Sequence, residues 1–247
     1  MRLHVKIFLV FLFFLRIQTT IYGQNNKINY TTQFWTVATA IGHINEKFQW
    51  QCDLQDYRQS PYENTALLKY NQLMSIQGAI HYFLKPNIIL SVYEGLWYCY
   101  FIGGDVNQRE FPEYRTSFQV QYNRVSGRDF LINRIRTEVR EIKDNKGDFE
   151  TALRGRYMLR YQHLLSHENY DKFSCYSILS DELYFNGGSP VTGYKLFDQN
   201  RLFIGIGYKC TPNISIETVY LNLFVYHSHN TDFDSDNIWQ ISLIWEN

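Results

Sequence analysis

The sequence predicts an all-β protein that folds as a single antiparallel transmembrane β-barrel. Apolar and polar residues alternate along many segments, for example 115–123 and 201–209, as expected for strands with one apolar face. These segments are about 10 to 16 residues long, which fits tilted membrane strands better than the five or six residues usual in soluble sandwiches. Tight turns alternate with long polar loops, as they do between the two rims of an outer-membrane barrel.

The alternating segments follow one another along the chain. Most have Val, Ile, Leu or an aromatic residue at every second position, with polar or charged residues between them. In chain order, the clearest alternating parts of these longer strands are 27–35, 48–54, 74–82, 95–104, 115–123, 133–141, 154–162, 180–186, 201–209, 214–220 and 239–245. In the strand that contains 95–104, Glu94 stands among apolar neighbours, so we expect a β-bulge within that strand.

The connectors set the expected strand number. Tight turns are expected at 42–46, 85–87, 125–129 and 211–213, and long loops at 58–69, 103–112, 186–199 and 227–236. The short turns should lie on the periplasmic rim and the long loops outside. About eleven strands can be counted, whereas bacterial barrels usually have an even number. Either part of an extra strand is hidden in 27–35 or one strand is divided wrongly in this count. We therefore predict twelve strands, with ten as the alternative.

Residues 1–23 have the form of a secretory signal peptide. Arg2 and Lys6 precede the apolar stretch 7–15, and Gly23 is a small residue before a cut at Gln24. About nine apolar residues are too few to span a bilayer. We therefore expect a cleaved signal at 1–23 and a barrel domain at 24–247, exported to the outer membrane.

Composition argues against several other classes of protein. The formal net charge is +0, which gives no electrostatic support for nucleic-acid binding. No apolar run after the signal reaches the roughly 18 residues of a membrane helix. The cysteines are too widely spaced for a zinc motif or a dense disulfide framework, so we expect them unpaired, with one disulfide as the alternative. They are Cys52, Cys99, Cys175 and Cys210.

One face of several predicted strands carries charge, and we expect that face to line the lumen. A charge on the lipid side would cost about 2 to 4 kcal/mol at the midplane, so the apolar face should meet lipid. The predicted pore-lining residues are Arg115, Arg134, Arg136, Glu138, Arg140, Arg154, Arg156, Arg160, Glu182, Arg201 and Glu217, with Glu113 as a further carboxylate.

These charges admit two functions. An excess of arginine favours a narrow channel for small anions or acidic oligosaccharides. A lattice of Arg–carboxylate pairs would instead close the lumen, leaving a structural or surface-interaction barrel that acts through its outer loops. In either case the expected partner is outer-membrane lipid, and the barrel is expected to be a monomer.

Catalysis, metal and cofactor binding are not expected. A lipid-modifying enzyme is a second alternative, with His81 pointing inward or His163 pointing to lipid as its base, but no serine stands in an elbow motif. The loop 227–236 alternates His and Asp yet lacks calcium-loop spacing, which favours a solvated acidic loop. The five tryptophans are expected in aromatic girdles at the membrane interfaces. They are Trp35, Trp50, Trp97, Trp239 and Trp245.

The segments "EYRTSFQVQY", "INRIRTEVRE", "RGRYMLRYQ", "SDELYFN", "FDQNRLFIGIGYK" and "ISIETVYLN" resemble the domain-of-unknown-function 2490 family. The likeness covers almost all of the expected mature chain and is most specific at 198–201. Val219 departs from it, because the family tends to have Gly there. Members are exported proteins of Gram-negative bacteria, common in Bacteroidetes, and taken to be outer-membrane β-barrels. The resemblance implies a fold and a location but no activity.

Overall fold

The computed structural model describes residues 28–62, 64, 66, 68–100, 111–144, 146–166, 173–190, 192–226 and 233–247. The expected signal peptide, 1–23, lies outside these residues. The described chain consists of strands, and it contains no helix long and apolar enough to cross a membrane. The strands are β1 (Ile28–Asn29), β2 (Thr32–His43), β3 (Phe48–Gln59), β4 (Tyr70–Lys85), β5 (Ile88–Cys99), β6 (Phe111–Ser126), β7 (Asp129–Lys143), β8 (Phe149–Leu164), β9 (Ser174–Asn186), β10 (Phe197–Lys209), β11 (Ile214–Tyr226) and β12 (Phe233–Glu246).

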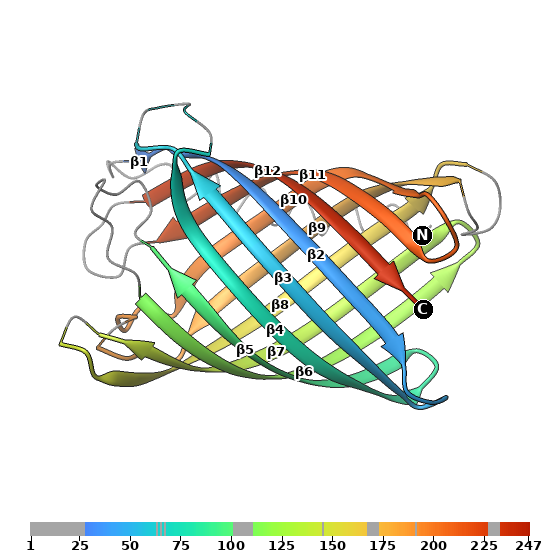
Figure 1. Ribbon diagram of the computed structural model, residues 1–247, viewed down its shortest axis with the longest axis horizontal. Helices are drawn as coiled ribbons and strands as arrows, with labels where there is room; N and C mark the ends of the chain where they lie inside the picture. Colours follow the sequence, from blue (N-terminus) through green and yellow to red (C-terminus); the bar gives the residue numbers. More distant parts are fainter. Residues whose placement is uncertain are drawn as a thin grey trace.

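Strands β2 to β12 wind around one closed barrel and are tilted to its long axis (Figure 1). Each pairs with its neighbour in the sequence, and β12 pairs with β2 to close the ring. Closure leaves no free sheet edge among these strands, so their backbone groups find partners within the sheet. The predicted all-β barrel is confirmed, and so is the prediction of long strands: β2 to β12 have 12 to 16 residues each.

The twelve described strands divide into eleven in the ring and one beside it. β1 is a two-residue strand within the expected segment 27–35, and it pairs with the start of β12. Since eleven is odd, the first and last strands of the ring run in the same direction, and the β2–β12 pair is parallel where an antiparallel pair was expected. β1 and β2 thus lie one after the other along β12.

The side chains of the barrel alternate sharply between its two surfaces. Asp53 is 5% exposed and the next residue, Leu54, 52%; Gln119 is 4% exposed and Val120 50%. Polar side chains therefore face the interior and apolar ones face out, as the alternation predicts. The described part of the strand that contains 95–104 has no such bulge: the β5–β6 pairing runs without a shift from Ile88 to Cys99, and Glu94 lies on the outer surface. Residues 101–104 lie outside the described residues.

The connectors follow the predicted alternation with two exceptions. On the long-loop rim they span 60–69, 100–110, 144–148, 187–196 and 227–232, and on the short-turn rim 44–47, 86–87, 127–128, 165–173 and 210–213. The first exception is the short connector 144–148, and the second is the longer one at 165–173. Gly127 adopts the left-handed conformation (φ 59°) that the two-residue turn 127–128 needs.

Apolar side chains also fill part of the interior. One cluster joins β2, β3, β11 and β12 and consists of Trp35, Tyr57, Leu221, Leu223 and Ile238. The Trp35 and Tyr57 rings are stacked, with their centroids 4.0 Å apart. A second cluster joins β8, β9 and β11 and consists of Leu164, Tyr176, Ile178 and Val219. The four cysteines are free.

Candidate functional site

The structure gathers the predicted charged residues inside the barrel, on β6 to β11. Each of the eleven makes an ion pair or hydrogen bond with another interior side chain or lies against an interior aromatic ring. We call this set, together with Glu113, the Arg–Glu lattice. It is built from carboxylates that each accept hydrogen bonds from one or two guanidinium groups. Whether these residues line a conducting pore stays a prediction.

Glu113 on β6 is the first centre of the lattice. It accepts two hydrogen bonds from Arg115 on the same strand, at 2.5 and 3.1 Å, and two from Arg140 on β7, at 2.5 and 2.9 Å. Bidentate pairs of this kind are the strongest geometry that a guanidinium and a carboxylate can adopt. Glu113 is 2% exposed, so its charge is balanced almost entirely by these two arginines.

Two further carboxylates share Arg156 on β8. Glu138 accepts from Arg154 Nε at 2.7 Å and from Arg156 Nη1 at 2.6 Å. Glu182 on β9 accepts from Arg156 Nη2 at 2.8 Å and from Arg134 Nη2 at 2.6 Å. Arg156 therefore links two carboxylates, and the lattice continues from β7 across β8 to β9.

The fourth carboxylate ties the lattice to the apolar interior. Glu217 on β11 accepts hydrogen bonds from Arg160 Nη2 at 2.6 Å and from the Tyr176 hydroxyl at 2.9 Å. The Tyr176 ring occupies the space above Gly207, where a Cβ would lie 2.2 Å from it. Glycine at 207 is thus what lets Tyr176 reach Glu217.

Two arginines are held by groups other than carboxylates. Arg136 donates two hydrogen bonds to the Gln119 amide oxygen, at 2.9 and 2.6 Å, and its guanidinium lies 4.0 Å from the centroid of Tyr93. The Arg201 guanidinium lies against the rings of Trp35 and Tyr184, at 5.1 and 4.8 Å. Its Nε has no hydrogen-bond partner among the described residues. Cation–π contacts stabilise both groups, and the lattice keeps a positive surplus.

The expected tryptophan girdle is wrong for two of its five residues. Trp35 is 1% exposed and Trp97 4% exposed, and both face the interior. Trp97 stacks with Arg115, whose guanidinium lies 4.3 Å from its ring centroid. Trp50, Trp239 and Trp245 are exposed on the outer surface, consistent with the girdle expectation.

A polar cavity of about 370 Å³ remains in the lumen beside the lattice. Its wall includes Asp53, which accepts hydrogen bonds from Thr39, Gln51 and Gln77 at 2.8 to 2.9 Å. Arginines of the lattice form the opposite wall. The cavity wall is therefore mostly polar, with apolar residues such as Val37, Leu73 and Ile244 among the polar ones, and its charge is predominantly positive.

His81 lies close to this cavity and points inward, as the alternation predicts. Its Nδ1 is 2.8 Å from the Ser91 hydroxyl, and its Nε2 is 2.9 Å from the Gln51 amide oxygen. Gln51 in turn donates to Asp53, so the four side chains form one hydrogen-bonded series. A hydroxyl next to an oriented imidazole is the arrangement of a nucleophile and its base. However, His81 is 7% and Ser91 4% exposed, and both face away from the outer wall.

The predicted acidic loop 227–236 lies partly outside the described residues, which include Asp234 and Asp236 but not 227–232. The solvated-loop interpretation is wrong for these two aspartates, which are fully buried at the start of β12. Asp236 accepts hydrogen bonds from Thr31 and Gln33, and Asp234 accepts one from Asn29. These two aspartates thus fix residues 29–33 to the start of β12, near the long-loop rim. No group of three or more metal-ligating side chains occurs among the described residues.

Within the specific motif 198–201, Arg201 faces the lattice, whereas Asn200 meets β9 on the opposite face of the sheet. Asn200 donates to the Asp181 carboxylate at 2.5 Å, and Asp198 lies 3.8 Å from Arg154. Arg201 forms the two ring contacts described above. Val219 packs in the second apolar cluster opposite Gly205, whose lack of a side chain leaves it room.

Fold and interior together define the class of this protein: a closed β-barrel whose lumen holds ion pairs and apolar clusters. The chain belongs to the DUF2490 family, since the family model described as "Protein of unknown function (DUF2490)" matches residues 32–234. The predicted family membership is thereby confirmed, over a range that runs from β2 to the first residues of β12. No curated protein and no solved structure matches the chain.

Proposed function

We propose that this protein is an outer-membrane barrel with a sealed lumen, which acts as a structural or surface-interaction barrel through its outer surfaces. The membrane location is supported by the exposed apolar outer wall, the strand lengths and the signal-like N-terminus. Residues such as Leu54, Ile76 and Ile204 are more than half exposed on that wall, which fits a surface solvated by lipid.

The sealed lumen rests on one observation, the burial of the interior charges. In a barrel with a water-filled passage, side chains on the inner wall would be accessible to water. Here the carboxylates Glu113, Glu138 and Glu182 are 2 to 3% exposed, and Trp35 on the other side of the lumen is 1% exposed. The Arg–Glu lattice therefore meets the apolar cluster around Trp35 in the middle of the lumen. The contact between them is the Arg201 guanidinium, which lies against the Trp35 ring.

A narrow passage for small anions is the second candidate. The positive surplus of the lattice and the cavity of about 370 Å³ favour it, because both would attract an anion that entered the barrel. A lipid-modifying enzyme has less support, since Ser91 and His81 face the interior whereas lipid would meet the outer wall.

Single-channel recording distinguishes the first two candidates. The chain without residues 1–23 is refolded in detergent, inserted in a planar bilayer, and tested across a salt gradient. A sealed barrel gives a folded, heat-modifiable band on a gel but no discrete openings. Regular openings with an anion-selective reversal potential, weakened by Arg134→Glu, would overturn the sealed barrel and establish the passage.

A further inference from the structure

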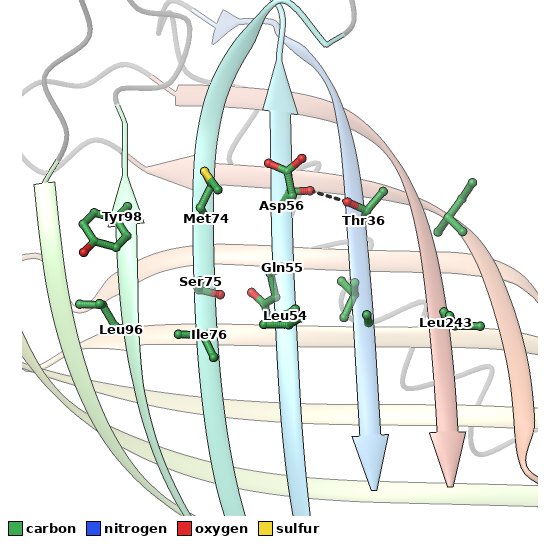
Figure 2. A pocket seen from close by; sticks show the side chains of 13 residues that line it. Thr36, Leu54, Gln55, Asp56, Met74, Ser75, Ile76, Leu96, Tyr98 and Leu243 are labelled. Atoms are coloured by element: carbon green, nitrogen blue, oxygen red, sulfur yellow. Dashed lines mark hydrogen bonds between the residues drawn. The ribbon is translucent and has the colours of Figure 1, made fainter.

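A groove on the outer wall and the cavity in the lumen differ in chemistry. The groove has a volume of about 600 Å³ and a mostly apolar wall, which includes Leu54, Ile76 and Leu243 (Figure 2). Such a wall suits surrounding lipid and selects no particular ligand. The lumen cavity, of about 370 Å³, has charged groups in its wall. A single water needs only about 10 to 15 Å³ of cavity, so the lumen has room for a small ligand together with several waters.

The charges in the wall of the lumen cavity are not balanced. Among the described residues this wall contains seven arginines, and five of them pair with a carboxylate of the Arg–Glu lattice. The sixth, Arg136, donates to the neutral amide of Gln119. The seventh, Arg201, forms no ion pair or hydrogen bond with any described residue and contacts only aromatic rings. Positive charge that is shielded from water attracts an anion strongly, so the cavity favours an anionic occupant.

Arg201 lacks a partner because the carboxylate opposite it is already occupied. Its register partner on β9 is Glu182. Glu182 Oε1 accepts from Arg134 Nη2 at 2.6 Å and from Arg156 Nε and Nη2 at 3.0 and 2.8 Å. Its Oε2 accepts from the Tyr184 hydroxyl at 2.9 Å. A carboxylate offers about four acceptor sites, so Glu182 has none left for Arg201.

The unused donors near Arg201 face the cavity. Arg201 Nε is enclosed, but Nη1 and Nη2 are not, and no described residue accepts a hydrogen bond from them. The Trp35 ring, which contacts the Arg201 guanidinium, stacks on the Tyr57 ring. Tyr57 lines the same cavity, and its hydroxyl makes no hydrogen bond with a described residue. A planar guanidinium can bind two oxygens of one oxyanion, and a phenolic hydroxyl can donate to another.

We propose that the lumen cavity binds one inorganic tetrahedral oxyanion, such as phosphate, at Arg201. The two Nη groups of Arg201 bind the anion, and the Tyr57 hydroxyl donates to it. Arg136, in the same wall, adds electrostatic attraction. The anion supplies the negative charge that Glu182 cannot give to Arg201, and thereby completes the Arg–Glu lattice. This proposal rests on the proposed function and deepens it, because an occupied cavity is part of a sealed lumen.

The aromatic residues of the wall favour an inorganic oxyanion over a larger organic phosphate. A sugar or a base would need an open ring face on which to stack. Guanidinium groups already lie against the rings of Trp35, Tyr93 and Trp97, at 5.1, 4.0 and 4.3 Å from their centroids. The cavity therefore presents cationic and hydrogen-bonding groups in place of open ring faces.

Equilibrium dialysis of the refolded barrel against labelled phosphate tests the site. One sample is refolded in labelled phosphate, and a second is refolded in chloride and given labelled phosphate afterwards. In the first sample we expect one phosphate per barrel. Arg201→Gln should weaken binding about tenfold or more, because hydrogen bonds from a charged donor are lost. Tyr57→Phe keeps the ring on Trp35 and should weaken binding about fivefold, the value of one neutral hydrogen bond. Arg124→Gln, at an exposed position near the end of β6, is the control and should bind phosphate as the unmodified chain does.

Two results would overturn the oxyanion site. One is a folded barrel that holds no phosphate after refolding in it, and the other is undiminished binding by Arg201→Gln. That substitution leaves no carboxylate unpaired, so the variant should fold, and heat-modifiable migration verifies this. Sulfate present during refolding should compete with phosphate, whereas equally effective competition by chloride would reduce the site to a diffuse attraction and refute it.

The second sample tests the proposed function separately. A sealed lumen takes up no phosphate after refolding, although the sample refolded in phosphate holds one. Equal binding in the two samples would refute the sealed lumen and still support the oxyanion site at Arg201. A barrel that shows no openings in bilayer recording and holds no phosphate in either sample would refute the site alone.

Discussion

Two regions fill the lumen by opposite means. On β6 to β9 the filling is ionic, with carboxylates such as Glu138 surrounded by guanidinium groups. On β11, β12, β2 and β3 it is apolar, with Leu221 and Ile238 packed against the Trp35–Tyr57 stack. The ionic region depends on exact pairing, because a buried charge without its partner is strongly destabilising. The apolar region depends on volume, because a removed side chain leaves a cavity. The two regions should therefore respond differently to substitution.

The largest effect is expected from Glu138→Ala in the ionic region. It leaves Arg154 and Arg156 without the carboxylate that they share, and we expect the free energy of unfolding to fall by about 4 kcal/mol, within the range for breaking a buried pair. The two repelling guanidiniums should also draw water and anions into the lumen. Urea unfolding of the vesicle-inserted barrel, followed by tryptophan fluorescence, gives the energy, and bilayer recording shows whether the variant conducts.

Glu141→Ala is the matched control for that substitution. Glu141 lies three positions along the same strand but faces outward, where its carboxylate accepts a hydrogen bond only from Thr151 among the described residues. A surface interaction of this kind contributes about 0 to 1 kcal/mol. If Glu138→Ala and Glu141→Ala proved equally mild, the lattice would not be the element that stabilises this side of the barrel.

A smaller loss of stability, without conduction, is expected from Leu221→Ala in the apolar region. Leu221 is fully buried beside Trp35. We expect about 3 kcal/mol from the lost contacts and the cavity. Since a cavity lined by apolar groups stays dry, ions should still be excluded. The same urea and conductance measurements apply, with Ile204→Ala on the outer wall as the control. Regular conductance through Leu221→Ala would show that the intact Arg–Glu lattice does not seal the lumen without the apolar region.

The alternation of the sequence was sufficient to predict the barrel and the inward face of the arginines of the lattice. It could not predict the partners, because Arg134 meets Glu182 two strands away and Arg160 meets Glu217 three strands away. Such pairs depend on the stagger and diameter of the closed ring. It also failed for Trp97, which stands in a continuous apolar run where either face fits the pattern. Nor could the alternation predict that eleven strands close the ring while β1 pairs separately with the start of β12, because no local signal specifies that pairing.

The smallest effect is expected where the two regions join, at Tyr176. Its ring belongs to the second apolar cluster, while its hydroxyl donates to Glu217 in the lattice. Tyr176→Phe keeps the ring above Gly207 and leaves Arg160 as the partner of Glu217, so we expect a loss of about 1 kcal/mol, the usual value of one hydrogen bond. Tyr208→Phe, on the exposed outer wall, is the control and should change stability less. A loss near that of Glu138→Ala would mean that the ionic and apolar fillings depend on each other through this hydroxyl, and that the lumen is sealed by one cooperative network across β8 to β11.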